Sequence, residues 1–248
     1  MTGPSITVYV PRDAAARSVG AEETAAAIRL EAARRGLDIR IIRNGSRGLL
    51  WLEPLVEVAT AAGRVAYGPV AAEDVAGLFD AGFHHGGDHP LGHGLTAEIP
   101  YLQRQDRLLF ARCGVVDPLS ADDYLAHGGL AGLRRALAMA PEDIVQTVID
   151  SGLRGRGGAG FPTGIKWRTV MEQPAGEKFV CCNADEGDGG TFADRMLMEG
   201  DPFALLEGMV IAGLAVGAET GLIYLRSEYP DAADALRAAL ADRKSTRL

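Results

Sequence analysis

Residues 151–167 read SGLRGRGGAGFPTGIKW, and this stretch says more about the fold of the chain than any other. Six glycines fall within it: Gly152, Gly155, Gly157, Gly158, Gly160 and Gly164. Glycine tolerates positive φ and lets a ligand approach the main chain, so such a run exposes several N–H donors on one concave surface. Arg154, Arg156 and Lys166 add positive charge beside it. The turn is therefore predicted to hold a phosphorylated cofactor.

This turn departs from the common dinucleotide-binding fingerprint. GRGGAG at 155–160 fits GxGxxG only approximately, and that fingerprint follows a strand. The segment 141–151 instead has apolar residues at helical spacing and a proline at its first position, which predicts a helix. A flexible glycine linker is the alternative interpretation. Phe161, Ile165 and Trp167 count against a linker, because it would leave three large apolar side chains exposed.

A second informative stretch, residues 178–195, reads KFVCCNADEGDGGTFADR. Its first seven residues are predicted to form a buried strand. Ligands of parallel α/β sheets bind beyond the carboxyl ends of the strands, where Asn183, Asp185 and Glu186 are expected. These side chains suit the donors and acceptors of a flavin ring or its ribityl chain. Two alternatives remain open: a Mg²⁺ or Ca²⁺ site, and simple capping of a helix that starts near Thr191.

The sequences GLRGRGGAGFPTGIKW, CNADEGDGGTFADRMLMEGDPF and GLIYLRSEYP together resemble the NADH-binding flavoprotein (51 kDa-type) subunit of respiratory complex I. The likeness covers about 119–242 and looks greatest to the beta subunit of soluble NAD-dependent formate dehydrogenases. The diaphorase subunit of NAD-reducing hydrogenases is a near relative. The resemblance implies an FMN in the glycine-rich turn and NAD(H) stacked over the flavin for hydride exchange. It also implies partners, the other subunits of a multi-subunit NAD-linked dehydrogenase.

Carried over position by position, the resemblance implies ten cofactor-binding residues: Gly155, Arg156, Gly157, Gly158, Gly160, Phe161, Lys166, Asn183, Asp185 and Glu186. The glycines and Arg156 would line the FMN, and Lys166 would contact it as a point charge. Phe161 would pack on the nicotinamide nucleotide. Asn183 and Asp185 would form hydrogen bonds with the flavin or its ribityl chain. Glu186 would lie where flavin and nicotinamide meet, and it is the one expected catalytic residue. The flavin carries the hydride chemistry, so no nucleophile or metal ligand is expected.

The first hundred residues are predicted to form a separate unit. The expected order is strand 6–10, helix 14–35, strand 38–43, a hairpin of 55–60 and 64–67, and helix 72–81. This order resembles the thioredoxin-like fold of the smaller complex I flavoprotein partner. That relative binds a two-iron cluster through four cysteines, whereas no cysteine precedes Cys113 here. The unit is therefore expected to be a structural or docking module.

The expected fold class is α/β, in three parts. A thioredoxin-like domain without iron–sulfur ligands covers 1–82, a linker covers 83–118, and the N-terminal part of an FMN-binding α/β domain covers 119–248. Within these parts we expect a strand or extended segment at 104–113, helices at 122–138, 202–216 and 231–241, and a strand at 221–226. The family continues with a second glycine-rich segment, a ubiquitin-like domain and a four-cysteine bundle. We expect the chain to be truncated before these, so that iron–sulfur clusters lie in the missing region or in partner subunits.

Composition sets further bounds. The 248 residues are 47% hydrophobic, and their net charge of −8 offers no footprint for nucleic acid. Neither a membrane-length apolar run nor a signal peptide is evident, and three cysteines cannot build a disulfide framework, so a cytoplasmic location is expected. His84, His85, His89 and His93 favour an exposed polar linker over a metal site.

Three functions remain in view. The primary hypothesis is the flavoprotein subunit of a formate dehydrogenase. The second is the corresponding subunit of an NADH:quinone oxidoreductase or an NAD-reducing hydrogenase. The third, from a different class, is a docking fragment that cannot hold flavin because half of the pocket is absent.

Overall fold

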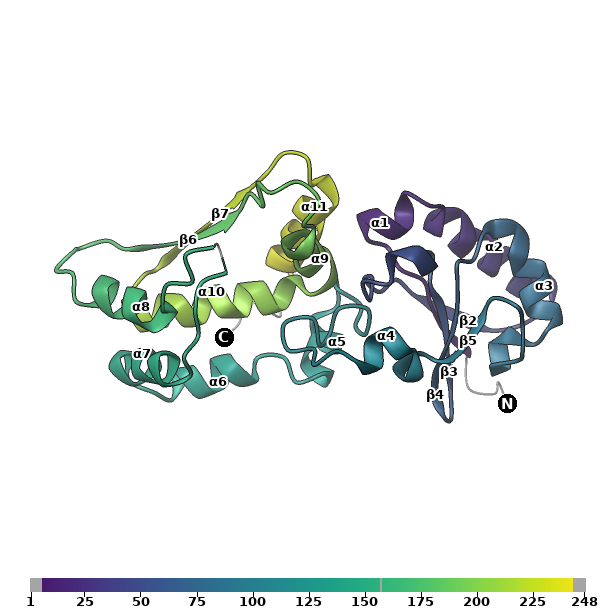
Figure 1. Ribbon diagram of the computed structural model, residues 1–248, viewed down its shortest axis with the longest axis horizontal. Coiled ribbons are helices and arrows are strands. Elements are labelled where there is room, and N and C mark those ends of the chain that lie inside the picture. The colour runs from purple at the N-terminus through teal and green to yellow at the C-terminus, as the bar shows by residue number, and fades with distance from the viewer. Residues whose placement is uncertain (1–5, 157, 243–248) are drawn as a thin grey trace.

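The computed structural model describes residues 6–156 and 158–242. Gly157, one of the residues expected to line FMN, lies outside the described residues. The described residues form a mixed α/β fold with a five-stranded and a two-stranded sheet. The first sheet belongs to the N-terminal part, at the right of Figure 1, and the second to the C-terminal part, at the left.

The N-terminal sheet has the strand order β2-β1-β3-β4-β5. Its strands are β1 (Ile6–Tyr9), β2 (Ile39–Ile42), β3 (Val56–Thr60), β4 (Gly63–Tyr67) and β5 (Gly92–Leu95). The helices of this part are α1 (Ala14–Arg17), α2 (Ala21–Arg34), α3 (Val75–Asp80) and α4 (Pro100–Gln103). β1 and β2 are parallel, and the pairs β1–β3, β3–β4 and β4–β5 are antiparallel. The core includes Val8, Ile28 and Phe79, so α2 and α3 pack on the sheet.

Three sequence-based predictions in this part are wrong. The single helix expected at 14–35 is two helices, because Gly20 takes φ 99° between them. The linker expected at 83–118 contains β5, and Nε2 of His93 lies 2.8 Å from the carbonyl oxygen of Gly68. Residues 104–113 form turns and irregular chain rather than a strand.

The C-terminal part packs around one long apolar helix. Its elements are α5 (Ala121–Ala126), α6 (Ala131–Leu137), α7 (Pro141–Asp150), α8 (Thr163–Met171), β6 (Phe179–Ala184), α9 (Ala193–Gly200), α10 (Pro202–Val216), β7 (Thr220–Leu225) and α11 (Pro230–Ala241). α10 lies between the β6–β7 pair and helices α6 and α7 (Figure 1). The helix predicted at 122–138 is broken into α5 and α6, because Gly128 and Leu130 take φ values of 82° and 60°.

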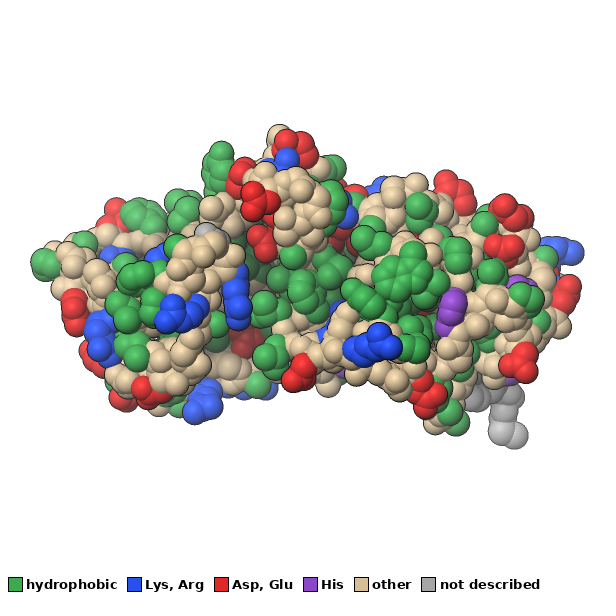
Figure 2. Space-filling view, in the orientation of Figure 1, with side chains coloured by type: hydrophobic (Ala, Val, Ile, Leu, Met, Phe, Trp, Pro, Cys, Tyr) green, Lys and Arg blue, Asp and Glu red, His purple; other side chains and the backbone are tan. Residues whose placement is uncertain are grey.

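The two parts meet along a polar seam. The main-chain N–H of Ala14 donates to Oε2 of Glu199 at 2.7 Å, and Nε of Arg112 donates to Oδ2 of Asp201 at 2.8 Å. A Cβ added to Gly45 would lie 2.7 Å from Cα of Gly200, so the main chains approach too closely for any larger residue. On the face shown in Figure 2, apolar side chains gather over the middle of the molecule.

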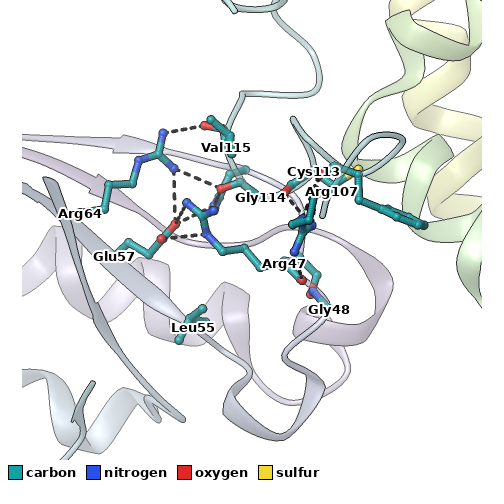
Figure 3. A network of polar contacts seen from close by, with 12 residues as sticks. Arg47, Gly48, Leu55, Glu57, Arg64, Arg107, Cys113, Gly114 and Val115 are labelled. Atoms are coloured by element: carbon teal, nitrogen blue, oxygen red, sulfur yellow. Dashed lines mark hydrogen bonds and ion pairs between the residues drawn. The ribbon is translucent and has the colours of Figure 1, made fainter. Parts of the chain in front are cut away.

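A buried carboxylate fixes the segment that leads from one part to the other. Glu57, in β3, is 1% exposed and accepts from Nε of Arg47 at 2.9 Å and from Nη1 of Arg64 at 3.4 Å. Arg64 also donates to the carbonyl oxygens of Gly114 at 3.1 Å and Val115 at 2.6 Å. The Arg64 guanidinium therefore ties the connecting segment to the N-terminal sheet, while Arg47 shares the same carboxylate (Figure 3).

Candidate functional site

The glycine-rich turn joins α7 to α8 and closes as a short hairpin. The N–H of Gly155 donates to the carbonyl oxygen of Phe161 at 2.9 Å, and Nη1 of Arg154 donates to that of Gly160 at 2.6 Å. Arg154 thus stabilises the turn itself. The side chain of Phe161 is 47% exposed and stays accessible to a ligand.

The tip of the turn is open. Gly158 and Gly160 take φ values of 87° and 58°, and a Cβ added to either would meet no described atom within 4 Å. In the described part of the turn, the main-chain N–H groups of Arg156, Gly158 and Ala159 donate to no described atom of the chain. The side chains of Arg156 and Lys166 are exposed. Amides without a described acceptor, in a stretch that also carries these two cations, are a chemical fit for the phosphate of FMN.

The strand β6, which leads to the acidic cluster of Asp185 and Glu186, is covered on one face only. Phe179 is 50% exposed whereas Ala184 is 3% exposed, because α10 packs against alternate residues of β6. The prediction of a buried strand is therefore wrong for the other face. That face carries Asn183, whose Oδ1 accepts from the N–H of Asp185 at 3.2 Å.

Glu186 caps a helix. Its Oε1 accepts from the N–H of Asp194 at 2.8 Å and its Oε2 from the N–H of Arg195 at 3.1 Å, both at the start of α9. The capping that the sequence left open is therefore present for this acid. Burial, and then the charge of Glu186, raise the pKa of Asp194. No group of three or more His, Cys, Asp or Glu residues within 6–156 and 158–242 is arranged to hold a metal ion.

The predicted site residues fall into two groups that the described contacts leave separate. The turn bonds within itself and packs through α8 on α7, where a Cβ on Gly164 would lie 2.5 Å from Cγ1 of Ile149. The cavity of about 420 Å³ beside β6 is lined by Asn183 and Asp194, and within the described ranges no residue of the turn lines it. The elements that carry the two groups, α8 and β6, both contact α10.

Sequence reasoning missed one residue of this site. The hydroxyl of Tyr229 donates to Oε2 of Glu186 at 3.0 Å. Tyr229 follows β7, the parallel neighbour of β6, so its loop leaves the same sheet edge as the acidic cluster. The pairing of the two strands, once recognised, would have pointed to it.

The C-terminal part of the chain matches a model of a known protein family. Residues 148–247 match the family model described as the Nuo51 FMN-binding domain. That segment is therefore similar to the complex I 51 kDa-type family, in agreement with the sequence resemblance.

The individual relatives are subunits of larger NAD(P)-linked enzymes. NADP-reducing hydrogenase subunit HndC of Solidesulfovibrio fructosivorans is 49% identical over 142 residues, which are 57% of this chain and 29% of the relative. An NADH-quinone oxidoreductase subunit of Escherichia coli (strain K12) is 46% identical over 127 residues, 50% of this chain and 28% of the relative. The crystal structure of an NAD⁺-reducing [NiFe]-hydrogenase superposes with a TM-score of 0.46 at 25% identity, covering 100% of this chain and 42% of that one. The chain thus spans less than a third of the length of the two curated relatives.

Proposed function

We propose that the chain is the FMN- and NAD(H)-binding part of a flavoprotein subunit in a multi-subunit NAD-linked oxidoreductase. The observation that carries this proposal is the open glycine-rich turn, which lies inside the segment that matches an FMN-binding domain. When bound, FMN would supply the hydride chemistry, between NAD(H) and iron–sulfur centres of other subunits. No helix in the described part of the chain has the length and apolarity to cross a membrane. A cytoplasmic location remains part of the proposal.

The chain's own residues would act by binding and orientation. The amides of Arg156 and Gly158 would donate to the phosphate, with Lys166 as countercharge, and Phe161 would offer its exposed ring to the nicotinamide nucleotide. Glu186 would place a fixed negative charge near the flavin ring. Formate as the electron donor rests on the sequence resemblance alone, whereas the relatives described above are hydrogenase and NADH-quinone oxidoreductase subunits.

The N-terminal part is proposed to be a thioredoxin-like docking module. Support comes from the order β2-β1-β3-β4 with β1 and β2 parallel and the α2 crossover between them. With no cysteine before Cys113, it would carry no iron–sulfur cluster. The boundaries proposed from the sequence, 1–82, 83–118 and 119–248, would place β5 of this sheet in the linker.

A docking fragment that cannot hold flavin is the second candidate. One observation favours it: the described contacts do not join the glycine-rich turn to Asn183, Asp185 or Glu186. Such a chain would bind its partner subunit without FMN.

Titration of the purified full chain with FMN and with riboflavin separates the two candidates. The flavoprotein proposal predicts that FMN binds and that riboflavin binds more weakly. Lys166→Ala should weaken the binding of FMN about ten-fold, because one charge-assisted hydrogen bond is lost, and should leave the binding of riboflavin unchanged. Arg168→Ala, a cation on the same helix whose Nη2 bonds Gln146 at 2.6 Å, is the matched control and should change neither. A chain that binds neither ligand would contradict the proposal and support the docking fragment.

A further inference from the structure

Two loops meet beside the start of α9. β6 and β7 are parallel, with Ala184 opposite Leu225, so the chain leaves both strands at the same sheet edge. Glu186 lies in the first loop and Tyr229 at the end of the second, where it is 5% exposed. The two residues are 43 positions apart in the sequence and bond through their side chains.

Both the side chain and the main chain of Glu186 are held. Oε2 accepts from the hydroxyl of Tyr229 at 3.0 Å in addition to the N–H of Arg195 at 3.1 Å. Its carbonyl oxygen accepts from Nη1 of Arg226 at 2.8 Å. Its φ is 42°, a left-handed conformation that non-glycine residues rarely adopt. Contacts from another loop therefore accompany an unusual main-chain conformation.

Helix capping alone does not account for this arrangement. A cap needs only the main-chain amides of α9, and Glu186 already accepts from two of them. Tyr229 adds a third donor from the loop after β7. The guanidinium carbon of Arg226 lies 4.9 Å from the centre of the Tyr229 ring, and Nη2 of Arg226 pairs with Oε1 of Glu228 at 3.1 Å. Arg226, which is held by Glu228, therefore restricts the position of the Tyr229 ring.

We propose that Tyr229 is a positioning residue, which sets the orientation of the Glu186 carboxylate toward bound cofactor, while Arg226 holds the main chain of Glu186. This inference rests on the proposed function, since it assigns Glu186 to the cofactor site. Tyr229 acts through Glu186 and does not itself contact the cofactor. The phenol fixes one carboxylate oxygen, so that the negative charge of Glu186 keeps one place relative to flavin and nicotinamide.

The first test needs no cofactor. Burial, and then the hydrogen bond to Glu186, raise the pKa of Tyr229. In the full chain labelled with ¹³C at tyrosine Cζ, Glu186→Gln should lower the pKa of Tyr229, because it removes the carboxylate that the phenol bonds. An unchanged Tyr229 titration would overturn the inference, because the contact would then be absent in solution.

The second test is a double-mutant cycle on the FMN-loaded chain. Tyr229→Phe keeps the ring and removes only the hydroxyl. With an added artificial electron acceptor that reoxidises the reduced flavin, it should raise the KM for NADH about ten-fold and leave FMN content unchanged. In a Glu186→Gln background the same change should have less than about a two-fold effect, because the hydroxyl acts through that carboxylate. Tyr224→Phe is the matched control and should leave the KM unchanged.

The outcomes separate the inference from the proposed function. Equal effects of Tyr229→Phe in both backgrounds would show a merely structural role and overturn the inference, while FMN binding by the unmodified chain would leave the proposed function intact. The same holds if Tyr229→Phe has no effect on KM. An unmodified chain that binds no FMN would overturn both.

Discussion

Replacing Glu57 by alanine tests how strongly the buried ion pairs hold the N-terminal part. Glu57 is 1% exposed, and the side chains of its partners Arg47 and Arg64 are 14% and 17% exposed. Glu57→Ala would leave both guanidinium groups largely buried without a counter-charge, which costs about 3–5 kcal/mol of unfolding free energy. For a chain of this size, that loss corresponds to a fall in Tm of about 6–20 °C.

Urea unfolding followed by tryptophan fluorescence is a suitable assay. The chain has two tryptophans, with Trp51 in the N-terminal part and Trp167 in α8, so Trp167→Phe leaves a reporter of the part that contains Glu57. Asp234→Ala is the control, because its pair with Arg237 is exposed and should be worth less than about 1 kcal/mol. If Glu57→Ala lowered the free energy of unfolding by less than about 1 kcal/mol, the reasoning would be refuted. Water would then be solvating the charges of both arginines.

Two further predictions concern the seam and the turn. Burial raises the pKa of Glu199 to about 7, above its ordinary 4.5, so the folded chain keeps a proton that the unfolded chain releases between these values. The unfolding free energy should therefore fall as the pH rises from about 4.5 to 7, and Glu199→Gln should flatten this fall in pH-dependent urea titrations. Gly164→Ala would press a Cβ to 2.5 Å from Ile149 and should destabilise the chain by about 1–3 kcal/mol in thermal unfolding. Gly176→Ala, where a Cβ meets no atom within 4 Å, is its control and should leave Tm nearly unchanged.

The sequence predicted the strands and most helices well where the pattern was local. Short runs of strand-forming residues located β1, β3 and β4, and the proline at 141 located the start of α7. Predictions failed where one residue's main-chain conformation decided the outcome, as at Gly20 and Leu130. β5 was missed for a different reason. GHGL has little apolar pattern, and the strand forms because β4 offers it an edge.

The same distinction applies to the candidate site. The glycine-rich turn was predictable, because its glycines and cations are adjacent in the sequence and its conformation is local. The orientation of Glu186 was not, because it depends on Tyr229 and Arg226, about forty residues later. Only the pairing of β6 with β7 brings them together.

Helix α9 links the candidate site to the N-terminal part. Its first turn is capped by Glu186, and Glu199 near its last residue accepts from the N–H of Ala14, at the start of α1. The eight residues of α9 span only about 12 Å. Gly200 ends the helix against Gly45, where the main chains touch. The N-terminal part, though without cysteine ligands of its own, therefore forms the surface against which the helix capped by Glu186 is packed.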